Sequence, residues 1–232
     1  MLVIGHRGAP NLSIENTIDS FNKAFENGVD GIELDIQLTR DKKIAVFHDF
    51  NTHSLDKKNT ALKDIDLVEL QDISSGFSIP TLEDVFKIIP KDKELHIEIK
   101  SNQINNDYII DQTAKLTSKY GYTNQTIISS FNPFILKKIK QTYPEQRIGA
   151  LWSKSKNTPW FVTHQICEIV KPFSFHASIK YFDQFMANWV KAQNLKLYFY
   201  TVNNKADLNK AISFQADGIF SDNPQILSKF RY

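Results

Sequence analysis

The sequence predicts an α/β fold, a (β/α)8 TIM-type barrel with a small insertion after the second barrel strand. Short apolar runs alternate with helical patterns from one end of the chain to the other, and this alternation implies a parallel sheet. The 232 residues suit one such barrel. A doubly wound open sheet is the competing architecture, but Gly5 and Gly8 do not complete its G-x-G-x-x-G phosphate-binding signature.

The expected strands and helices follow one another in pairs. The strands cover 2–5, 31–36, 95–100, 126–130, 147–152, 173–177, 196–202 and 217–221. The helices cover 16–27, 81–89, 107–119, 133–142, 159–168, 182–193, 205–214 and 224–230. Thr81 and Asp84 have the spacing of a helix-capping pair, and Pro133 and Pro224 stand where a first helical turn would begin.

One apolar stretch does not fit the alternation. Ile44 to Phe47 follows Ile36–Leu38 after about five residues, whereas a parallel crossover needs roughly a dozen. We therefore expect an antiparallel ribbon here. Residues 49–79 are polar with weak periodicity and are expected to form an irregular insertion over the barrel mouth. The whole chain, 1–232, is predicted to be a single barrel domain that carries the ribbon and insertion at 37–79.

Composition and charge exclude several classes of partner. The 28 basic and 26 acidic residues leave a net charge of +2, which is too small to favour nucleic acid or an anionic membrane surface. No apolar run approaches the ~18 residues of a membrane span, and Met1–Ile4 is too short for a signal peptide. Cys167 is the only cysteine and is interpreted as a buried apolar residue. We expect a cytoplasmic monomer or homodimer.

Carboxylates lie on one face of the second expected strand. Side chains alternate along a strand, so Glu33 and Asp35 share a face while their apolar neighbours share the other. Two carboxylates in an apolar setting repel one another and lose solvation, and a bound cation would remove both penalties. The alternative is that this face is simply solvated.

The third expected strand repeats the pattern with His96, Glu98 and Lys100 on one face. The outer face of a barrel packs on helices, so this polar triplet should point into the barrel. Glu98 would then join Glu33 and Asp35, and Lys100 would supply a cation near the mouth. A structural Glu98–Lys100 ion pair is the alternative, and His96 is expected to lie in the core or behind the ligands.

Three further polar side chains complete the candidate site. His6 and Arg7 end the first strand, and His48 ends the ribbon. Three carboxylates without soft ligands suit a hard divalent cation, Ca²⁺ or Mg²⁺, better than zinc. The cation, Arg7 and Lys100 could offset the charge of a phosphodiester, and two histidines could transfer protons near neutral pH.

The sequence motifs of this chain resemble those of the glycerophosphodiester phosphodiesterase family. The matching stretches are His6-Arg7-Gly8, Glu15-Asn16-Thr17, Glu33-Leu34-Asp35, His48-Asp49, Ile79-Pro80-Thr81-Leu82, Glu98-Ile99-Lys100, Thr201-Val202-Asn203 and Asp217-Gly218-Ile219. They occur in the family's order and span nearly the whole chain. The ordered set is highly specific, whereas each stretch alone is weak.

The resemblance implies metal-dependent hydrolysis of glycerophosphodiesters, which are small-molecule substrates, to glycerol 3-phosphate and an alcohol. By motif position, the metal ligands would be Glu33, Asp35 and Glu98, the acid and base would be His6 and His48, and the phosphate contacts would be Arg7 and Lys100.

The chain departs from the family pattern at two places. Tyr200 stands where the family often has Trp, and we expect it to change the fit of the glycerol. The Arg that often follows the His-Asp pair is missing after His48-Asp49, which leaves the alcohol contacts open. Phe131 and His176 are further candidates for the pocket, with plain packing as the alternative for each.

Two rival functions stay open. One is a lysophospholipase D or phosphoinositide phospholipase-like phosphodiesterase on the same barrel, for which we would expect an apolar or basic rim at the mouth. The other is a non-catalytic phosphodiester binder. A binder would have lost the acid–base pair, and the presence of both His6 and His48 argues against it.

Overall fold

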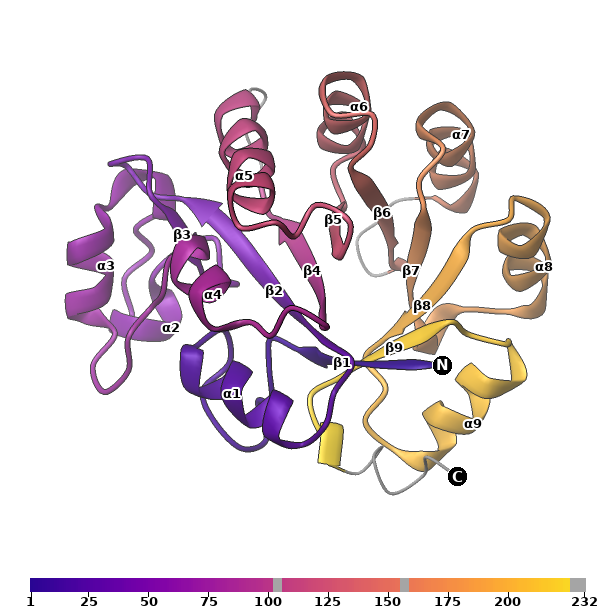
Figure 1. Cartoon of the computed structure of the whole chain (residues 1–232), viewed down its shortest axis with the longest axis horizontal. Helices are drawn as coiled ribbons and strands as arrows, with labels where there is room; N and C mark the ends of the chain where they lie inside the picture. Colours follow the sequence, from indigo (N-terminus) through magenta and orange to yellow (C-terminus); the bar gives the residue numbers. More distant parts are fainter. Residues whose placement is uncertain (102–105, 155–158, 226–232) are drawn as a thin grey trace.

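The computed structural model describes residues 1–101, 106–154 and 159–225. Eight parallel strands close into a barrel in the order β1-β2-β4-β5-β6-β7-β8-β9, and β9 pairs with β1 (Figure 1). The strands are β1 (Leu2–His6), β2 (Gly31–Leu38), β4 (Glu94–Ile99), β5 (Thr126–Ser130), β6 (Arg147–Trp152), β7 (Ser174–Ser178), β8 (Lys196–Tyr200) and β9 (Gly218–Ser221). The predicted TIM-type barrel is confirmed.

Helices surround the barrel (Figure 1). They are α1 (Ile18–Glu26), α4 (Leu82–Ile88), α5 (Asp107–Lys119), α6 (Pro133–Thr142), α7 (Trp160–Val170), α8 (Gln184–Ala192) and α9 (Lys205–Ser213), with a 3-10 turn η3 (Ile179–Tyr181) before α8. Thr81 and Asp84 form the predicted capping box of α4, and Pro133 begins α6. Most of the helix predicted at 224–230 lies outside the described residues.

The antiparallel ribbon is also confirmed. Strand β3 (Ile44–Val46) pairs with β2 so that Ile36 faces Val46 and Leu38 faces Ile44. The insertion after it was expected to be irregular, and this was wrong. It contains α2 (His53–Asp56), the 3-10 turn η1 (Leu62–Asp64) and α3 (Leu67–Ile73). These elements are too short to show a helical period in the sequence.

The insertion has a small core of its own beside the barrel. Leu62, Leu70 and Ile79 are at most 1% exposed and pack with Ala45 of the ribbon. Figure 1 shows α2 and α3 next to β3, at the side of the barrel. Among the described residues of 37–79, only His48 lines the cavity at the barrel mouth.

Two layers of packing set the position of the strand ends. Outside the barrel, Ile32, Leu34 and Ile36 of β2 are fully buried in the main hydrophobic core. Inside it, His96 is also fully buried, with its ring 5.1 Å from those of Tyr198 and Phe220 and 5.5 Å from that of His176. The inner rings form a floor beneath the polar groups of the mouth.

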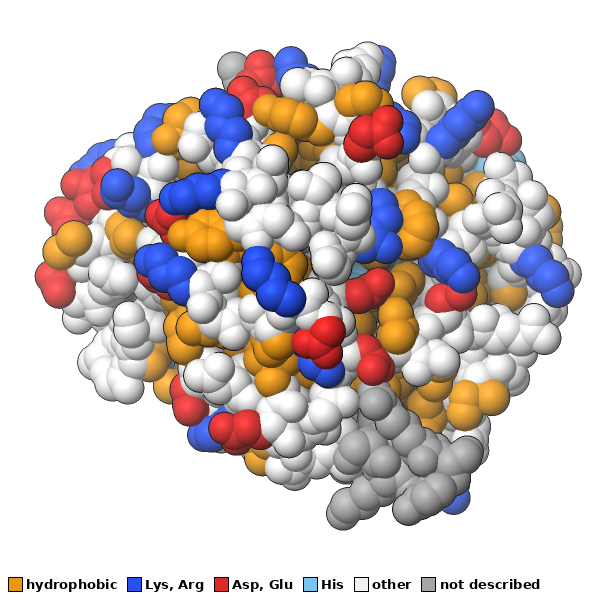
Figure 2. Space-filling view, viewed as in Figure 1, with side chains coloured by type: hydrophobic (Ala, Val, Ile, Leu, Met, Phe, Trp, Pro, Cys, Tyr) orange, Lys and Arg blue, Asp and Glu red, His pale blue; other side chains and the backbone are white. Residues whose placement is uncertain are grey.

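A missing side chain makes room in this floor. A Cβ atom on Gly149 of β6 would lie 2.7 Å from Cε1 of His176, so only glycine allows the close approach. On the face drawn in Figure 2, acidic and basic side chains are interspersed.

Candidate active site

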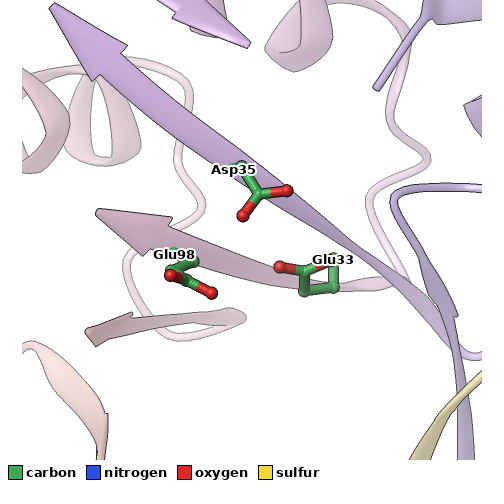
Figure 3. Close-up of side chains that lie close together, drawn as sticks. All are labelled: Glu33, Asp35 and Glu98. Atoms are coloured by element: carbon green, nitrogen blue, oxygen red, sulfur yellow. The ribbon is translucent and has the colours of Figure 1, made fainter. Parts of the chain in front are cut away.

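Three carboxylates meet at the mouth of the barrel. Glu33 and Asp35 lie on β2 and Glu98 on the neighbouring β4, and Asp35 and Glu98 pair in register. One oxygen atom from each carboxylate lies within 4.8 Å of the others. Figure 3 shows the three side chains pointing toward a common space. The alternation of side chains along each strand therefore predicted this cluster, with Glu33 and Asp35 on the same face.

The cluster carries more negative charge than its surroundings balance. Burial and the charge of Asp35 raise the pKa of Glu33 to about 7 and that of Glu98 to about 8. Burial also opposes ionisation of Asp35, but Arg7 and Lys100 outweigh it and lower the pKa of Asp35. A bound cation would favour ionisation of the two carboxyl groups whose pKa is raised, so the cluster could hold one.

Two cationic side chains flank the cluster. Nε of Arg7 lies 3.1 Å from Oδ2 of Asp35, and Nη1 of Arg7 donates to both carboxylate oxygens of Glu15, at 2.9 and 3.0 Å. Nζ of Lys100 lies 3.6 Å from Asp35 and 3.8 Å from Glu98. The Glu98–Lys100 ion pair, which was the alternative interpretation of these two residues, exists, but as one part of a larger network. These contacts fix both cations at the cavity wall.

His6 is anchored inside the barrel. Its Nδ1 lies 2.6 Å from Oδ1 of Asp222, and its Nε2 lies 3.9 Å from Oε2 of Glu33. Burial lowers the pKa of His6, but the hydrogen bond to Asp222 and the charge of Glu33 outweigh it, so the net pKa is raised. His6 is therefore suited to carry a proton at neutral pH.

His48 is held at the end of the ribbon. Nε2 of Gln37 donates to the carbonyl oxygens of Phe47, His48 and Asp49, at 2.9, 3.2 and 2.8 Å. Nδ1 of His48 lies 2.8 Å from Oδ1 of Asp49. Burial lowers the pKa of His48, and Arg7 and Lys100 lower it further, so His48 is suited to accept a proton.

One cavity of about 250 Å³ brings these groups together. Every residue predicted for the site lines it except Asp35, which lies in the acidic cluster. Its lining comprises His6, Arg7, Glu33, His48, Glu98, Lys100, Ser129, Phe131, Leu151, Ser153, His176, Tyr200, Thr201 and Phe220.

Aromatic side chains form another part of the cavity lining. The ring of Phe131 meets that of Tyr200 edge-on at 6.4 Å, and the hydroxyl of Tyr200 donates to the carbonyl oxygen of Trp152 at 2.7 Å. His176 lines the cavity and its Nε2 lies 2.8 Å from Oγ of Ser174. These positions allow both polar and stacking contacts with a small ligand.

Several residues of the network were not identified as site residues from the sequence. Gln37 and Asp222 were missed, and Glu15, Asn16 and Asn203 appeared only within motif stretches without a role. Asp222 directly follows the last barrel strand, which was the signal that could have revealed it. Two other histidines lie outside the cavity, since His53 is exposed and His164 pairs with Glu168 on the surface of α7.

Comparison with known proteins identifies similar chains over the full length. A family model described as the glycerophosphoryl diester phosphodiesterase family matches residues 6–226. The chain is 34% identical over 237 residues to a glycerophosphodiester phosphodiesterase of Caldanaerobacter subterraneus subsp. tengcongensis, and the match covers 97% of this chain and 96% of that protein.

Two solved structures are similar in fold. A glycerophosphodiester phosphodiesterase from Thermotoga maritima is 26% identical with a TM-score of 0.84, and the match covers 100% of this chain and 98% of that one. A phosphodiesterase from Oleispira antarctica, solved in complex with the product sn-glycerol-3-phosphate, is 24% identical with a TM-score of 0.87, covering 99% and 96%. Among the described residues, no helix combines the length and apolar character needed to cross a membrane.

Proposed function

Because the chain belongs to the glycerophosphoryl diester phosphodiesterase family, we propose that the mouth cavity is the active site at which it hydrolyses glycerophosphodiesters to glycerol 3-phosphate and an alcohol. The chain is thus an enzyme, a phosphoric diester hydrolase. One observation carries the assignment of the site: three carboxylates within 4.8 Å of one another adjoin two imidazoles and two cations in one cavity.

The acidic cluster fits a divalent cation. Its donors are all carboxylate oxygens, and burial together with the charge of Asp35 raises the pKa values of Glu33 and Glu98, a penalty on ionisation that a cation would offset. We propose that Glu33, Asp35 and Glu98 hold Ca²⁺ or Mg²⁺, both of which prefer oxygen ligands. When bound, the cation supplies Lewis-acid stabilisation of the charge that develops on the phosphoryl oxygens.

The two histidines are proposed to transfer the protons. The lowered pKa of His48 suits it to take a proton from the attacking water molecule, whose oxygen forms the new bond to phosphorus. The raised pKa of His6 suits it to give a proton to the departing alcohol oxygen. The hydrogen bond between His6 and Asp222 joins two residues of the chain and involves no bound cation, so it supports the role of His6 independently of the metal site.

The remaining lining residues are proposed to bind the substrate. Arg7 and Lys100 would contact the phosphate, because both are cations that the protein already fixes at the cavity wall. Phe131, His176 and Tyr200 would contact the glycerol, whose carbon chain can pack on their rings. Tyr200 keeps its hydroxyl proton, because burial raises its pKa.

Product analysis tests the function. The protein should release glycerol 3-phosphate from several glycerophosphodiesters when Ca²⁺ and Mg²⁺ are supplied in turn. His6→Ala should abolish most turnover while substrate still binds, and His164→Ala, at a surface histidine, should not. If neither Ca²⁺ nor Mg²⁺ supports turnover, the proposed enzymatic function is refuted. Faster turnover of a lysophospholipid than of its deacylated counterpart would favour the lysophospholipase D alternative.

Three broader predictions accompany this function. We propose that residues 1–232 form one barrel domain, with the ribbon and insertion at 37–79 as an elaboration of it. The monomer or homodimer state and the cytoplasmic location stay predictions from the sequence.

A further inference from the structure

The contact between His6 and Asp222 arises where the barrel closes. In the β1–β9 register Gly5 pairs with Ser221. The residues that follow them, His6 and Asp222, therefore reach the mouth at the same level, although they lie 216 positions apart in sequence. Their side chains meet at 2.6 Å. Asp222 therefore contacts the Nδ1 edge of the His6 ring, whereas Glu33 lies nearer to Nε2.

Asn203 holds the carboxylate of Asp222 in place. Its Nδ2 donates to Oδ2 of Asp222 at 2.6 Å, and its Oδ1 accepts from the backbone N–H of Asp222 at 2.9 Å. Oγ of Ser221 donates to the same Oδ1 at 3.2 Å. Each oxygen of the Asp222 carboxylate thus has its own partner, one in His6 and one in Asn203.

This geometry selects one form of the imidazole. An ionised carboxylate only accepts hydrogen bonds, so the short contact requires a proton on Nδ1 of His6. Nε2 is then the atom left to face Glu33 and the cavity. We propose that Asp222 is a positioning residue for the hydrolysis, and that it holds His6 so that Nε2 exchanges the proton with substrate.

This inference rests on the proposed function, because it assumes that His6 transfers a proton during hydrolysis. A purely structural role for Asp222, as a tie between β9 and β1, would need only a hydrogen bond to His6, which an amide at position 222 could also make. An amide keeps the tie but reverses the protonated nitrogen, so the response of kcat to that reversal separates positioning from structural support.

The first test uses the unmodified protein. Nitrogen-15 NMR of uniformly labelled protein, assigned by comparison with His6→Ala, reports which ring nitrogen of neutral His6 is protonated. We expect the proton on Nδ1. A neutral His6 with its proton on Nε2 would overturn the proposal, even if every variant of Asp222 failed to fold.

The second test is Asp222→Asn. Because Nδ2 of Asn203 donates toward this group, the new amide should turn its oxygen to Asn203 and its NH₂ group to His6. The imidazole would then carry its proton on Nε2, and kcat should fall about 10²–10⁴-fold with little change in KM. A kcat within about threefold of wild type would contradict the proposal.

A matched control lies just before the start of the same strand. Asp217 pairs with Lys196 and accepts from the backbone N–H of Leu197, beyond the opposite end of β9 from the cavity. Asp217→Asn removes a comparable carboxylate from the sheet. It should leave kcat and the protonated nitrogen of His6 unchanged, whatever it does to stability.

The double variant Asp222→Asn with Asn203→Asp provides the rescue. A carboxylate at position 203 accepts the NH₂ group of the new amide at 222, which turns the amide oxygen back to His6. The proton should return to Nδ1, and kcat should recover by at least about tenfold over the single variant. A double variant no more active than the single one would also contradict the proposal.

Discussion

The two histidines of the cavity are held by different parts of the molecule. His6 ends a barrel strand, its side chain is 17% exposed, and its partner Asp222 comes from the far end of the chain. His48 ends the ribbon, its side chain is 32% exposed, and its partner Asp49 is the next residue. One imidazole is therefore supported by the closed barrel and the other by a local excursion from it.

The two histidines proposed to transfer protons therefore depend on different parts of the structure for their positions. The position of His6 depends on the pairing of β1 with β9, which the whole barrel maintains. The position of His48 depends on Gln37, which gathers three backbone carbonyl oxygens at the ribbon end. A perturbation of the ribbon should then impair His48 and leave His6 in place. Loss of the Asp35 carboxylate should instead affect the surroundings of both histidines.

The largest effect is expected from Asp35→Asn. The carboxylate of Asp35 pairs with Arg7 and Lys100, and its negative charge also acts on His48, where it opposes the lowering of the pKa. Its removal weakens the acidic cluster and leaves two cations poorly balanced, so kcat/KM should fall by about 10⁴-fold or more. Steady-state kinetics and circular dichroism measure this, with Asp111→Asn as a control, because the carboxylate of Asp111 lies on α5 and accepts from the hydroxyl of Tyr143. A loss below about tenfold would show that Asp35 does not link the two sides.

The histidines themselves should give the next largest effects. His6→Ala and His48→Ala should each lower kcat about 10²–10⁴-fold on a glycerophosphodiester. They should differ on a p-nitrophenyl phosphodiester, whose leaving group departs without a proton. That substrate should restore much of the loss in His6→Ala but little in His48→Ala. The opposite pattern would exchange the acid and base assignments.

A smaller effect is expected from Gln37→Leu. Loss of the amide leaves ribbon carbonyl groups without their donor, so stability should fall by about 1–3 kcal/mol and kcat by roughly 10–100-fold through His48. Gln146→Leu is a matched control, because its amide also donates to two backbone carbonyl groups, those of Thr126 and Arg147. Denaturant melts and kinetics should show that the control loses stability without losing kcat. Equal kcat losses in both variants would remove the special role of the ribbon end.

The smallest effect should appear in the stability of the cation-free protein. The folded-state pKa values of Glu33 and Glu98 are about 7 and about 8, above the ordinary carboxyl value of 4.5. The folded protein therefore binds more protons than the unfolded chain between these values, and stability should fall as pH rises from about 5 to 8. The raised pKa of His6 acts in the same direction.

Thermal melts in a chelator measure this slope. Saturating Ca²⁺ or Mg²⁺ should flatten it, because bound cation keeps the carboxylates ionised at every pH of the series. Glu98→Gln should reduce the slope in the chelator. A slope that neither cation nor Glu98→Gln changes would place its origin outside the acidic cluster.

Much of the barrel and the acidic cluster could be predicted because both depend on local alternation. The period of two along each strand places Glu33 with Asp35 and places Glu98 on the inner face. The pairing of strands next to one another in the chain then brings them together. The capping pair at Thr81 and the proline at 133 marked helix starts by equally local chemistry.

What could not be predicted depends on distant contacts or on very short elements. Asp222 reaches His6 only through the register of β1 with β9, which the separate strands do not encode visibly. Gln37 was simply another polar residue until the ribbon folded its carbonyl groups onto it. Helix α2 has four residues and α3 has seven, so neither presents enough turns for a period to emerge.

Because the sequence has a single cysteine and that residue is buried, the insertion at 37–79 can be labelled at a cysteine introduced there. Cys167 is the only thiol in the sequence, it is buried, and burial raises its pKa to about 12. A thiolate is the reactive form, so a maleimide dye should leave native Cys167 largely untouched. Val68→Cys, at a side chain 66% exposed on α3, would carry a single fluorophore without prior removal of a native cysteine. The anisotropy of this fluorophore would then report on the motion of α3 while substrate binds in the cavity.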